Sequence, residues 1–379
     1  MGSIATRWRL LSGENEWAGL LDPLDIDLRR YIIHYGERAG AIGDGFIKET
    51  KSSNCGLPRY AKSQFFTKVG LENYNPYKYV VKKYLYAATM LSPGRSNWLA
   101  YVAVATDEGK EVLGRRDILI SWRGTVLDEE AGIDLLFDLV SASDILGSES
   151  GAKVHHGWHS YYTNVDPVSP YTKTSCRDQV LATIREVVDQ YKDEEISVTV
   201  TGYSMGAAFA ILNATDIVYN RYNVPTAYPD KACLVTSIVF ASPRLGDEGF
   251  RKVFSSLENL HVLRITNLHD VITILPPSSS YVHVGKELEI DTLKSPYLKD
   301  ASQSLHNLEV YLHGVAGTQG INGFKLEVYR DLALVNKKLD GLNDEHNVVA
   351  NWWTEKNKSM VQMDNGSWVL MDREKDDDN

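Results

Sequence analysis

The chain has 379 residues, 43% of them hydrophobic and 24% charged, which is typical of a soluble globular protein and long enough for a sheet enzyme with insertions. Its formal net charge of −10 gives no attraction to nucleic acid or to anionic bilayers, although a local apolar patch could still dock on a lipid surface. No run reaches the roughly 18 apolar residues of a membrane span, and the first residues lack the apolar core of a signal peptide.

The cysteines and the N-terminus bear on where the protein works. Cys55, Cys176 and Cys233 are far apart and odd in number, which predicts neither a disulfide framework nor a metal site. Reduced thiols favour a cytoplasmic location. Gly2 with Thr6 fits the short pattern for N-myristoylation, and a single such chain would give only weak membrane association. Nothing in the sequence defines an oligomeric state.

Taken in chain order, the predicted elements alternate between helix and strand. Apolar positions near helical spacing after Pro23 predict two short helices within residues 15–48. Runs rich in β-branched and aromatic residues predict strands at 97–106, 117–122, 196–202, 234–242 and 261–267. Helices are expected over 176–192 and directly after Ser204. This alternation favours an α/β fold with a mainly parallel central sheet and helices on both faces.

The whole chain reads as one domain with additions at both ends. We expect an N-terminal helical region over about 1–95, a catalytic core over about 96–318 and a C-terminal extension over about 319–379. The extension should contribute added strands, and its acidic end, DREKDDDN, should be disordered or solvated.

The central motif is Gly202-Tyr203-Ser204-Met205-Gly206, between a predicted strand and a predicted helix. A serine on a sharp strand-to-helix turn exposes its Oγ at the edge of the sheet, and the close backbone approach requires the flanking glycines. The motif predicts Ser204 as a nucleophile; the alternative is a plain glycine-rich turn with an inert serine.

A serine hydroxyl needs a base, and the base needs an orienting acid, in the chain order Ser, Asp or Glu, His for this fold. Asp270 follows the strand at 261–267 and is the expected acid, with a helix cap as its alternative role. Among the later histidines, His306 precedes a helical run and is the preferred base. His313, two turns further along that run, is the main alternative, and His283 lies in a strand-like run.

Two N–H donors should stabilise the negative charge that develops on the substrate oxygen. The backbone N–H of Met205 is one. Thr125, in the loop after the strand at 117–122, could give its N–H and its hydroxyl, although Arg-Gly-Thr is also an ordinary turn.

With these residues named, the chain resembles the plant lipases of class 3, close to the cytosolic phospholipase A1 group II enzymes and the anther-dehiscence acylhydrolases. The resemblance covers nearly the whole chain, and its ordered landmarks are WAGLLDPLDIDLR, SWRGT, VHHGWHSYYT, GYSMGAA, FASPRLGD, RITNLHDVITILP, YVHVGKEL, HNLEVYLHGVAG and WWTEKNKSMV.

The resemblance implies an α/β-hydrolase that works without cofactor or metal. It implies Ser204, Asp270 and His306 as the catalytic residues and Thr125 with Met205 as the oxyanion hole. It also implies a lid over 126–153, whose core IDLLFDLVSA is either a covering helix or a plain packed one.

The chain departs from the family pattern in three places. Tyr203 and Met205 replace the usual His and Leu of the motif, Ala131-Gly132 replaces an aromatic, and the usual proline is absent at Ala350-Asn351. Because the residue before the serine points away from the reacting group in the usual elbow, Tyr203 should alter packing rather than chemistry. These departures leave substrate preference open.

The expected activity is hydrolysis of the sn-1 ester of a glycerophospholipid through an acyl-enzyme on the serine. The expected partner is a lipid substrate, with peripheral contact to a membrane surface and none to nucleic acid. Galactolipids, acylglycerols or small esters are alternative substrates. A non-catalytic lipase-like scaffold is the rival of another class, and the intact Ser204, Asp270 and His306 speak against it.

Overall fold

The computed structural model describes residues 3–88, 94–276, 280–299, 304–318 and 323–376. Seven of the described strands form one mixed sheet in the order β1-β2-β3-β6-β7-β8-β9. Their bounds are β1 Tyr79–Ala88, β2 Ser96–Ala105, β3 Arg116–Trp122, β6 Ile196–Tyr203, β7 Leu234–Phe240, β8 Leu260–Asn267 and β9 Lys286–Ile290. The first three strands pair antiparallel, and β3, β6, β7, β8 and β9 pair parallel. The expected mainly parallel α/β sheet is confirmed.

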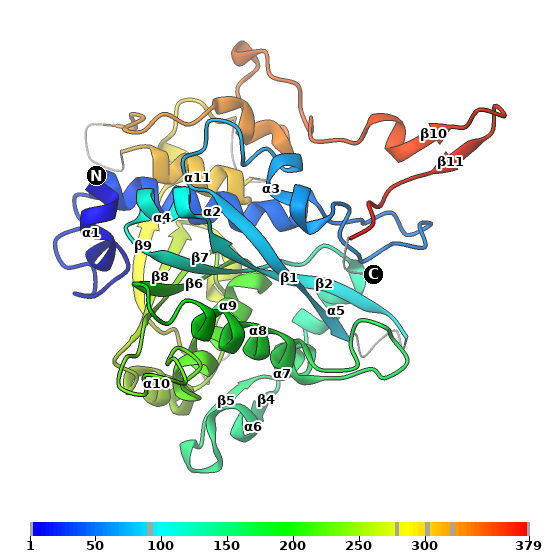
Figure 1. The fold of residues 1–379 in the computed structure, drawn as a ribbon. Helices are drawn as coiled ribbons and strands as arrows, with labels where there is room; N and C mark the ends of the chain where they lie inside the picture. Colours follow the sequence, from blue (N-terminus) through cyan, green and yellow to red (C-terminus); the bar gives the residue numbers. More distant parts are fainter. Residues whose placement is uncertain (1–2, 89–93, 277–279, 300–303, 319–322, 377–379) are drawn as a thin grey trace.

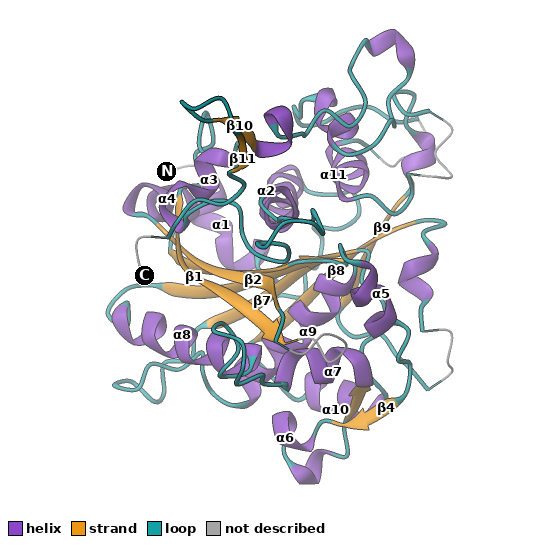
Figure 2. Ribbon diagram, turned by 90° about the vertical axis from the view of Figure 1, so that its right-hand side faces the viewer, coloured by secondary structure: helices purple, strands orange, loops and turns teal. Residues whose placement is uncertain are grey.

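Helices cover both faces of this sheet, as Figure 2 shows. One face carries α1 (Ser3–Leu11), α2 (Ile26–Asp44) and α11 (Leu308–Ala316), and the other carries α7 (His156–Thr163), α8 (Cys176–Gln190), α9 (Met205–Tyr219) and α10 (Glu248–Ser255). The shorter helices are α3 (Phe65–Lys68), α4 (Asp107–Leu113), α5 (Asp128–Asp134) and α6 (Ser143–Leu146). The large apolar core is accordingly split into two clusters, one on each side of the sheet.

The order of connections places the ends of the parallel strands together. Because β3, β6 and β8 run in the same direction, the loops after their last residues emerge at one edge of the sheet. The Arg-Gly-Thr loop, Ser204 and Asp270 all lie just after these strands. The fold therefore brings the predicted site residues to the same edge.

Two expectations for the N-terminal region are wrong. Residues 15–48 contain one long helix, α2, in place of two short ones, because Asp25 caps its first turn through Asp27 N and Leu28 N and the apolar face then continues to Asp44. The region before residue 95 is also not only helical, since it supplies the edge strand β1.

The C-terminal extension supplies added strands as expected, and only its acidic end differs from expectation. The extension holds short 3₁₀ turns and a separate two-stranded sheet of β10 (Met360–Gln362) and β11 (Trp368–Leu370). The acidic end is not simply solvated, because Glu374 and Asp376 accept hydrogen bonds from the N–H groups of Ala61 and Lys62. Gly2 and residues 377–379 lie outside the described residues, as does the start of the extension at 319–322.

Candidate active site

Ser204 occupies a strained turn between β6 and α9. Its φ of +59° and ψ of −128° are unfavourable for any residue with a side chain, and strain of this kind is characteristic of functional sites. A side chain at Gly202 would overlap the carbonyl of Gly206, and one at Gly206 would overlap that of Trp122. Both glycines are therefore required for the turn to form, as the motif predicts.

His306 lies in the loop directly before α11, with its ring directed at the serine. Asn307 caps the helix by accepting hydrogen bonds from Glu309 N and Val310 N, which fixes where the loop ends. The Asn267 amide, at the end of β8, donates to the carbonyl of Leu305 at 3.1 Å and ties the loop to the sheet. As a result, His306 Nε2 lies 2.9 Å from Ser204 Oγ.

Asp270 holds the other side of the imidazole. Its Oδ2 lies 2.8 Å from His306 Nδ1 and accepts a second hydrogen bond, at 2.6 Å, from the hydroxyl of Tyr311. Its Oδ1 accepts from Ile272 N at 3.0 Å. The carboxylate is almost fully buried, with 1% of its side chain exposed, so its orientation is fixed by these three donors.

This chain of contacts determines the protonation pattern that the site can use. An ionised Asp270 can only accept, so Nδ1 of His306 carries the proton and Nε2 presents its lone pair to the serine hydroxyl. A base in that state can take the Oγ proton while the buried carboxylate stabilises the resulting imidazolium. The geometry is that of an activated serine nucleophile.

The two alternative histidines lie elsewhere. His313 points away from the elbow, where its Nε2 lies 2.7 Å from Ser295 Oγ and its ring stacks on Phe324. His283 lies 2.8 Å from the carbonyl of Thr273. Burial lowers the pKa of each to about 4, so both are neutral structural histidines near pH 7.

The proposed oxyanion donors lie beside the serine. Met205 is the first residue of α9, where an N–H has no acceptor within the helix and is free to bind an anion. The backbone of Gly124 packs against Tyr203 and Ser204, which brings the Arg-Gly-Thr loop to the elbow.

The hydroxyl of Thr125 is already used in this structure. It donates to Asp134 Oδ2 at 2.6 Å, and Trp158 Nε1 donates to Oδ1 of the same carboxyl at 2.8 Å. Burial raises the pKa of Asp134. The expectation that this hydroxyl faces the substrate therefore does not hold for this conformation, and the N–H of Thr125 is the donor that remains.

A buried ion pair that sequence analysis did not identify supports the same loop. The guanidinium of Arg123 forms two hydrogen bonds with the carboxylate of Glu130 on α5, and both side chains are fully buried. The N–H groups of Val126 and Leu127 donate to the same carboxylate at 2.9 and 3.0 Å. Although burial opposes ionisation, the Arg123 charge holds the pKa of Glu130 below its usual value.

Tyr203 contacts the base directly, contrary to the expectation that it affects only packing. Its ring stacks on the His306 imidazole, with centroids 4.9 Å apart and planes at 30°. Its hydroxyl donates to the backbone carbonyl of His306 at 2.8 Å. No sequence pattern indicates this contact, because it joins residues more than one hundred positions apart.

The segment expected as a lid is divided between two short helices, α5 at its beginning and α6 near its end, with a strand between them. Only its beginning lies in α5; Leu139–Ser141 forms β4, which pairs antiparallel with β5 (Lys153–His155). Within the expected helical core, Asp134 is held by Thr125 and Trp158 and α5 ends there. The following Leu135 is 68% exposed. The expectation of an amphipathic helix over 133–142 is therefore wrong.

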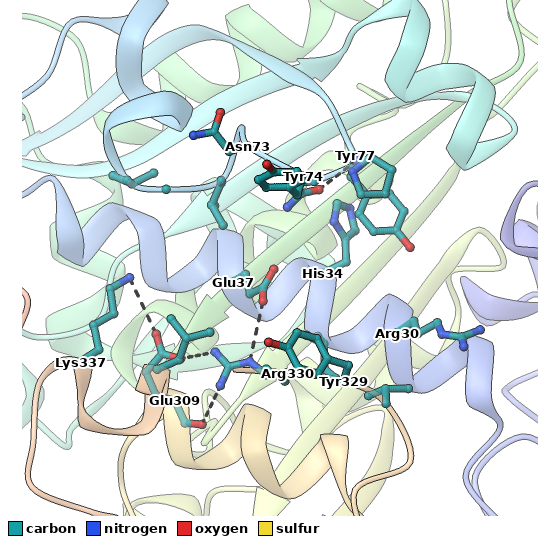
Figure 3. A pocket seen from close by; sticks show the side chains of 18 of the residues that line it. Arg30, His34, Glu37, Asn73, Tyr74, Tyr77, Glu309, Tyr329, Arg330 and Lys337 are labelled. Carbon is teal, nitrogen blue, oxygen red and sulfur yellow. Dashed lines mark hydrogen bonds and ion pairs between the residues drawn. The ribbon is translucent and has the colours of Figure 1, made fainter. Parts of the chain in front are cut away.

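Two cavities lie among the described residues, and the larger, of about 550 Å³, is lined by residues other than Ser204, Asp270 and His306. Figure 3 shows Glu37, Glu309, Arg330 and Lys337 pointing toward one another inside it. Arg330 pairs with Glu309 and lies 3.8 Å from Glu37, and Lys337 pairs with Asp44. These charges largely compensate one another where α2, α11 and the C-terminal extension meet. None of the three site side chains is among the described residues that line this cavity.

The smaller cavity, of about 210 Å³, adjoins Tyr203, the residue before the nucleophile. It is lined by Gly124, Thr125, Tyr203 and Asn307 together with the end of α2. Within the described ranges, no group of three or more His, Cys, Asp or Glu side chains is arranged to hold a metal ion. No helix there is long and apolar enough to cross a membrane.

Comparison with known proteins gives consistent matches. A family model for lipase (class 3) matches residues 119–280. Phospholipase A1-IIgamma of Arabidopsis thaliana is 51% identical over 396 residues, covering 99% of this chain and 94% of that protein. Phospholipase A1-II 4 of Oryza sativa subsp. japonica is 48% identical, covering 98% and 96%. A solved Rhizomucor miehei lipase propeptide complex is 19% identical with a TM-score of 0.45, covering 70% of this chain and 69% of its own.

Proposed function

The chain belongs to the class 3 lipase family, and from that premise we propose that it hydrolyses the sn-1 ester of glycerophospholipids. The names of its phospholipase A1-II relatives support this substrate and position. The single observation that carries the chemistry is the hydrogen-bonded series Ser204, His306 and Asp270. The chain is a serine ester hydrolase.

The first half of the reaction forms an acyl-enzyme. His306 Nε2 takes the proton of Ser204 Oγ as that oxygen attacks the ester carbonyl carbon, and Asp270 stabilises the imidazolium. The backbone N–H groups of Met205 and Thr125 stabilise the oxyanion. When the tetrahedral intermediate collapses, the ester bond breaks and the lysophospholipid oxygen leaves with the proton from Nε2.

The second half releases the fatty acid. His306 removes a proton from water, which attacks the acyl carbon on Ser204 and forms a second oxyanion. Collapse of that intermediate breaks the bond to Oγ, which regains its proton from Nε2. The enzyme returns to its starting state with a free fatty acid as the second product.

We further propose that the site meets its substrate at a lipid surface and that the protein works in the cytoplasm. Leu268, Val271 and Ile274 flank Asp270 and are 37%, 65% and 58% exposed, and exposed Leu135 follows α5. Such an apolar rim suits contact with acyl chains. The cytoplasmic location is supported by the three free cysteines.

Product analysis on a phosphatidylcholine with two distinct acyl chains tests the proposal. Mass spectrometry should find the sn-1 fatty acid and the 2-acyl lysophospholipid in the first turnovers, and neither with the Ser204→Ala variant. Release of the sn-2 chain would contradict the regiochemistry, and undiminished turnover by the variant would contradict the role of the serine.

A further inference from the structure

The hairpin of β10 and β11, residues 360–371, extends away from the body of the protein (Figure 1). It is a defined element rather than a frayed tail. Met363 N donates to Ser367 O, and Gly366 N donates to Met363 O, both at 2.8 Å, which closes the turn. Met371 N donates to Ser359 O at 2.9 Å and closes the base.

One face of this hairpin carries four exposed apolar side chains, with Ser367 opposite Met363 as the polar residue among them. Val361 pairs with Val369, so their side chains lie on the same face, and the alternation of strands places Met363 and Met371 on it as well. These four side chains are 42–59% exposed. On the other face, Trp368 is 54% exposed beside Gln362. An isolated two-stranded hairpin is at best marginally stable in water. Exposed apolar surface on such a hairpin therefore indicates an apolar partner.

The base of the hairpin is fixed to the body near the active site. Arg59 donates to Ser359 Oγ at 2.8 Å, and Tyr60 donates to Glu355, also at 2.8 Å. Upstream, the indole of Trp353 donates to the carbonyl of Asp44 at 3.3 Å. Asp44 lines both cavities, and Thr125 and Tyr203 line the smaller one with it. Figure 1 places the hairpin on the same side of the molecule as α5.

We propose that this hairpin inserts its apolar face into the surface layer of a lipid bilayer and so turns the active-site edge of the sheet toward the lipid. The inference rests on the proposed function, because the substrate then resides in that bilayer. Leu135, directly after α5, is a further exposed apolar side chain. Tryptophan is suited to the boundary between water and acyl chains.

Charge supports insertion rather than electrostatic attraction. With a net charge of −10, the molecule as a whole is repelled by anionic lipid. Lys356 and Lys358 at the hairpin base are exposed and can reach the phosphate level of a zwitterionic bilayer. Binding should therefore occur on phosphatidylcholine and weaken little as salt rises from about 0.05 to about 0.5 M.

The test measures binding separately from hydrolysis. The full chain is floated with vesicles of diether phosphatidylcholine, which contains no ester to cleave. Val361→Asp should lower the partition coefficient by tenfold or more while hydrolysis of a water-soluble short-chain ester stays unchanged. The double variant Met363→Gln and Met371→Gln keeps side-chain length and strand pairing, and it should also lower the partition coefficient. This variant distinguishes a loss of apolar contact from unfolding of the hairpin.

Val80→Asp is the matched control. Val80 is also 42% exposed on a strand, and β1 begins at the end of the sheet opposite the site, where β2 ends and β3 begins. It should bind vesicles like the unmodified chain. Equal binding by Val361→Asp, no binding by the unmodified chain, or a dimer in solution that Val361→Asp dissociates would overturn the inference. Vesicle binding through the hairpin without any phospholipid hydrolysis would instead contradict the proposed function.

Discussion

Tyr203 makes two contacts with His306. The tyrosine ring stacks on the imidazole, and the tyrosine hydroxyl donates to the backbone carbonyl of His306. Burial raises the pKa of Tyr203 well above its ordinary value, so its hydroxyl stays protonated and acts as a donor. The contact gives the residue before the nucleophile a positioning role, because the stacked ring limits how far the imidazole can rotate away from Ser204 and Asp270.

Replacing Tyr203 with Phe removes only the hydrogen bond to His306. A neutral hydrogen bond contributes about 1 kcal/mol, so kcat should fall roughly fivefold with little change in KM. Tyr203→Leu, which also removes the stacked ring, should reduce kcat further. Steady-state kinetics on a soluble ester provides the measurement, and a change confined to KM would argue against a role in holding the base.

The principal site residues were predictable because each carries a local signal. Ser204 lies between glycines at a strand end, Asp270 follows a strand, and His306 precedes the capped start of a helix. The supporting contacts were not predictable in this way. Tyr311 reaches Asp270, and Glu130 reaches Arg123, only because the fold brings separate elements together.

At the scale of elements, α5 and the Arg-Gly-Thr loop form one unit through the buried pair of Arg123 and Glu130. Removing one partner of such a pair leaves an uncompensated buried charge, which costs about 3–5 kcal/mol. Glu130→Gln should therefore lower the free energy of unfolding by about 3 kcal/mol, since the amide still accepts some hydrogen bonds, and should also lower kcat by displacing Thr125.

Asp128→Asn on the same helix is the control, because Asp128 is exposed and its replacement should shift the unfolding free energy by less than about 0.5 kcal/mol. Urea denaturation and kinetics on both variants make the comparison. Equal stability of the two variants would show that the ion pair is not what holds the loop.

Elements with a clear hydrophobic pattern were predicted well, and elements determined by side-chain hydrogen bonds were not. The strands β2, β3, β6, β7 and β8 match the apolar runs within one or two residues. The segment at 133–142 has a helix-like pattern but departs from it once Asp134 binds Thr125 and Trp158. The position of the acidic tail is likewise determined by its hydrogen bonds with the N–H groups of Ala61 and Lys62, which its charge alone does not predict.

At the scale of the whole molecule, buried neutral histidines make stability depend on pH. Burial lowers the pKa of His155, His283 and His313 to about 4, against 6.5 in an unfolded chain. Between those values the unfolded state binds more protons, so stability rises with pH and is lost as pH falls from about 6.5 toward about 4. Each histidine contributes up to about 1.4 kcal/mol per pH unit in that window.

The variant His313→Gln isolates one of these contributions. Its unfolding free energy, measured in urea at several pH values between about 7.5 and about 5, should decline less steeply than that of the unmodified chain. At neutral pH the variant should be less stable, because it weakens the contact with Ser295. The difference in unfolding free energy between the variant and the unmodified chain should narrow as the pH falls. Parallel curves would mean that His313 takes up its proton equally in both states.

The central claim is that Ser204 is a nucleophile activated by His306 and Asp270, and covalent labelling tests it most directly. A fluorophosphonate probe reacts with activated serines, and peptide mapping by mass spectrometry locates the adduct. The account predicts one stoichiometric adduct on Ser204 in the unmodified chain and a loss of labelling rate of at least about a hundredfold in His306→Ala. An unlabelled Ser204, or equal labelling of the two proteins, would contradict it.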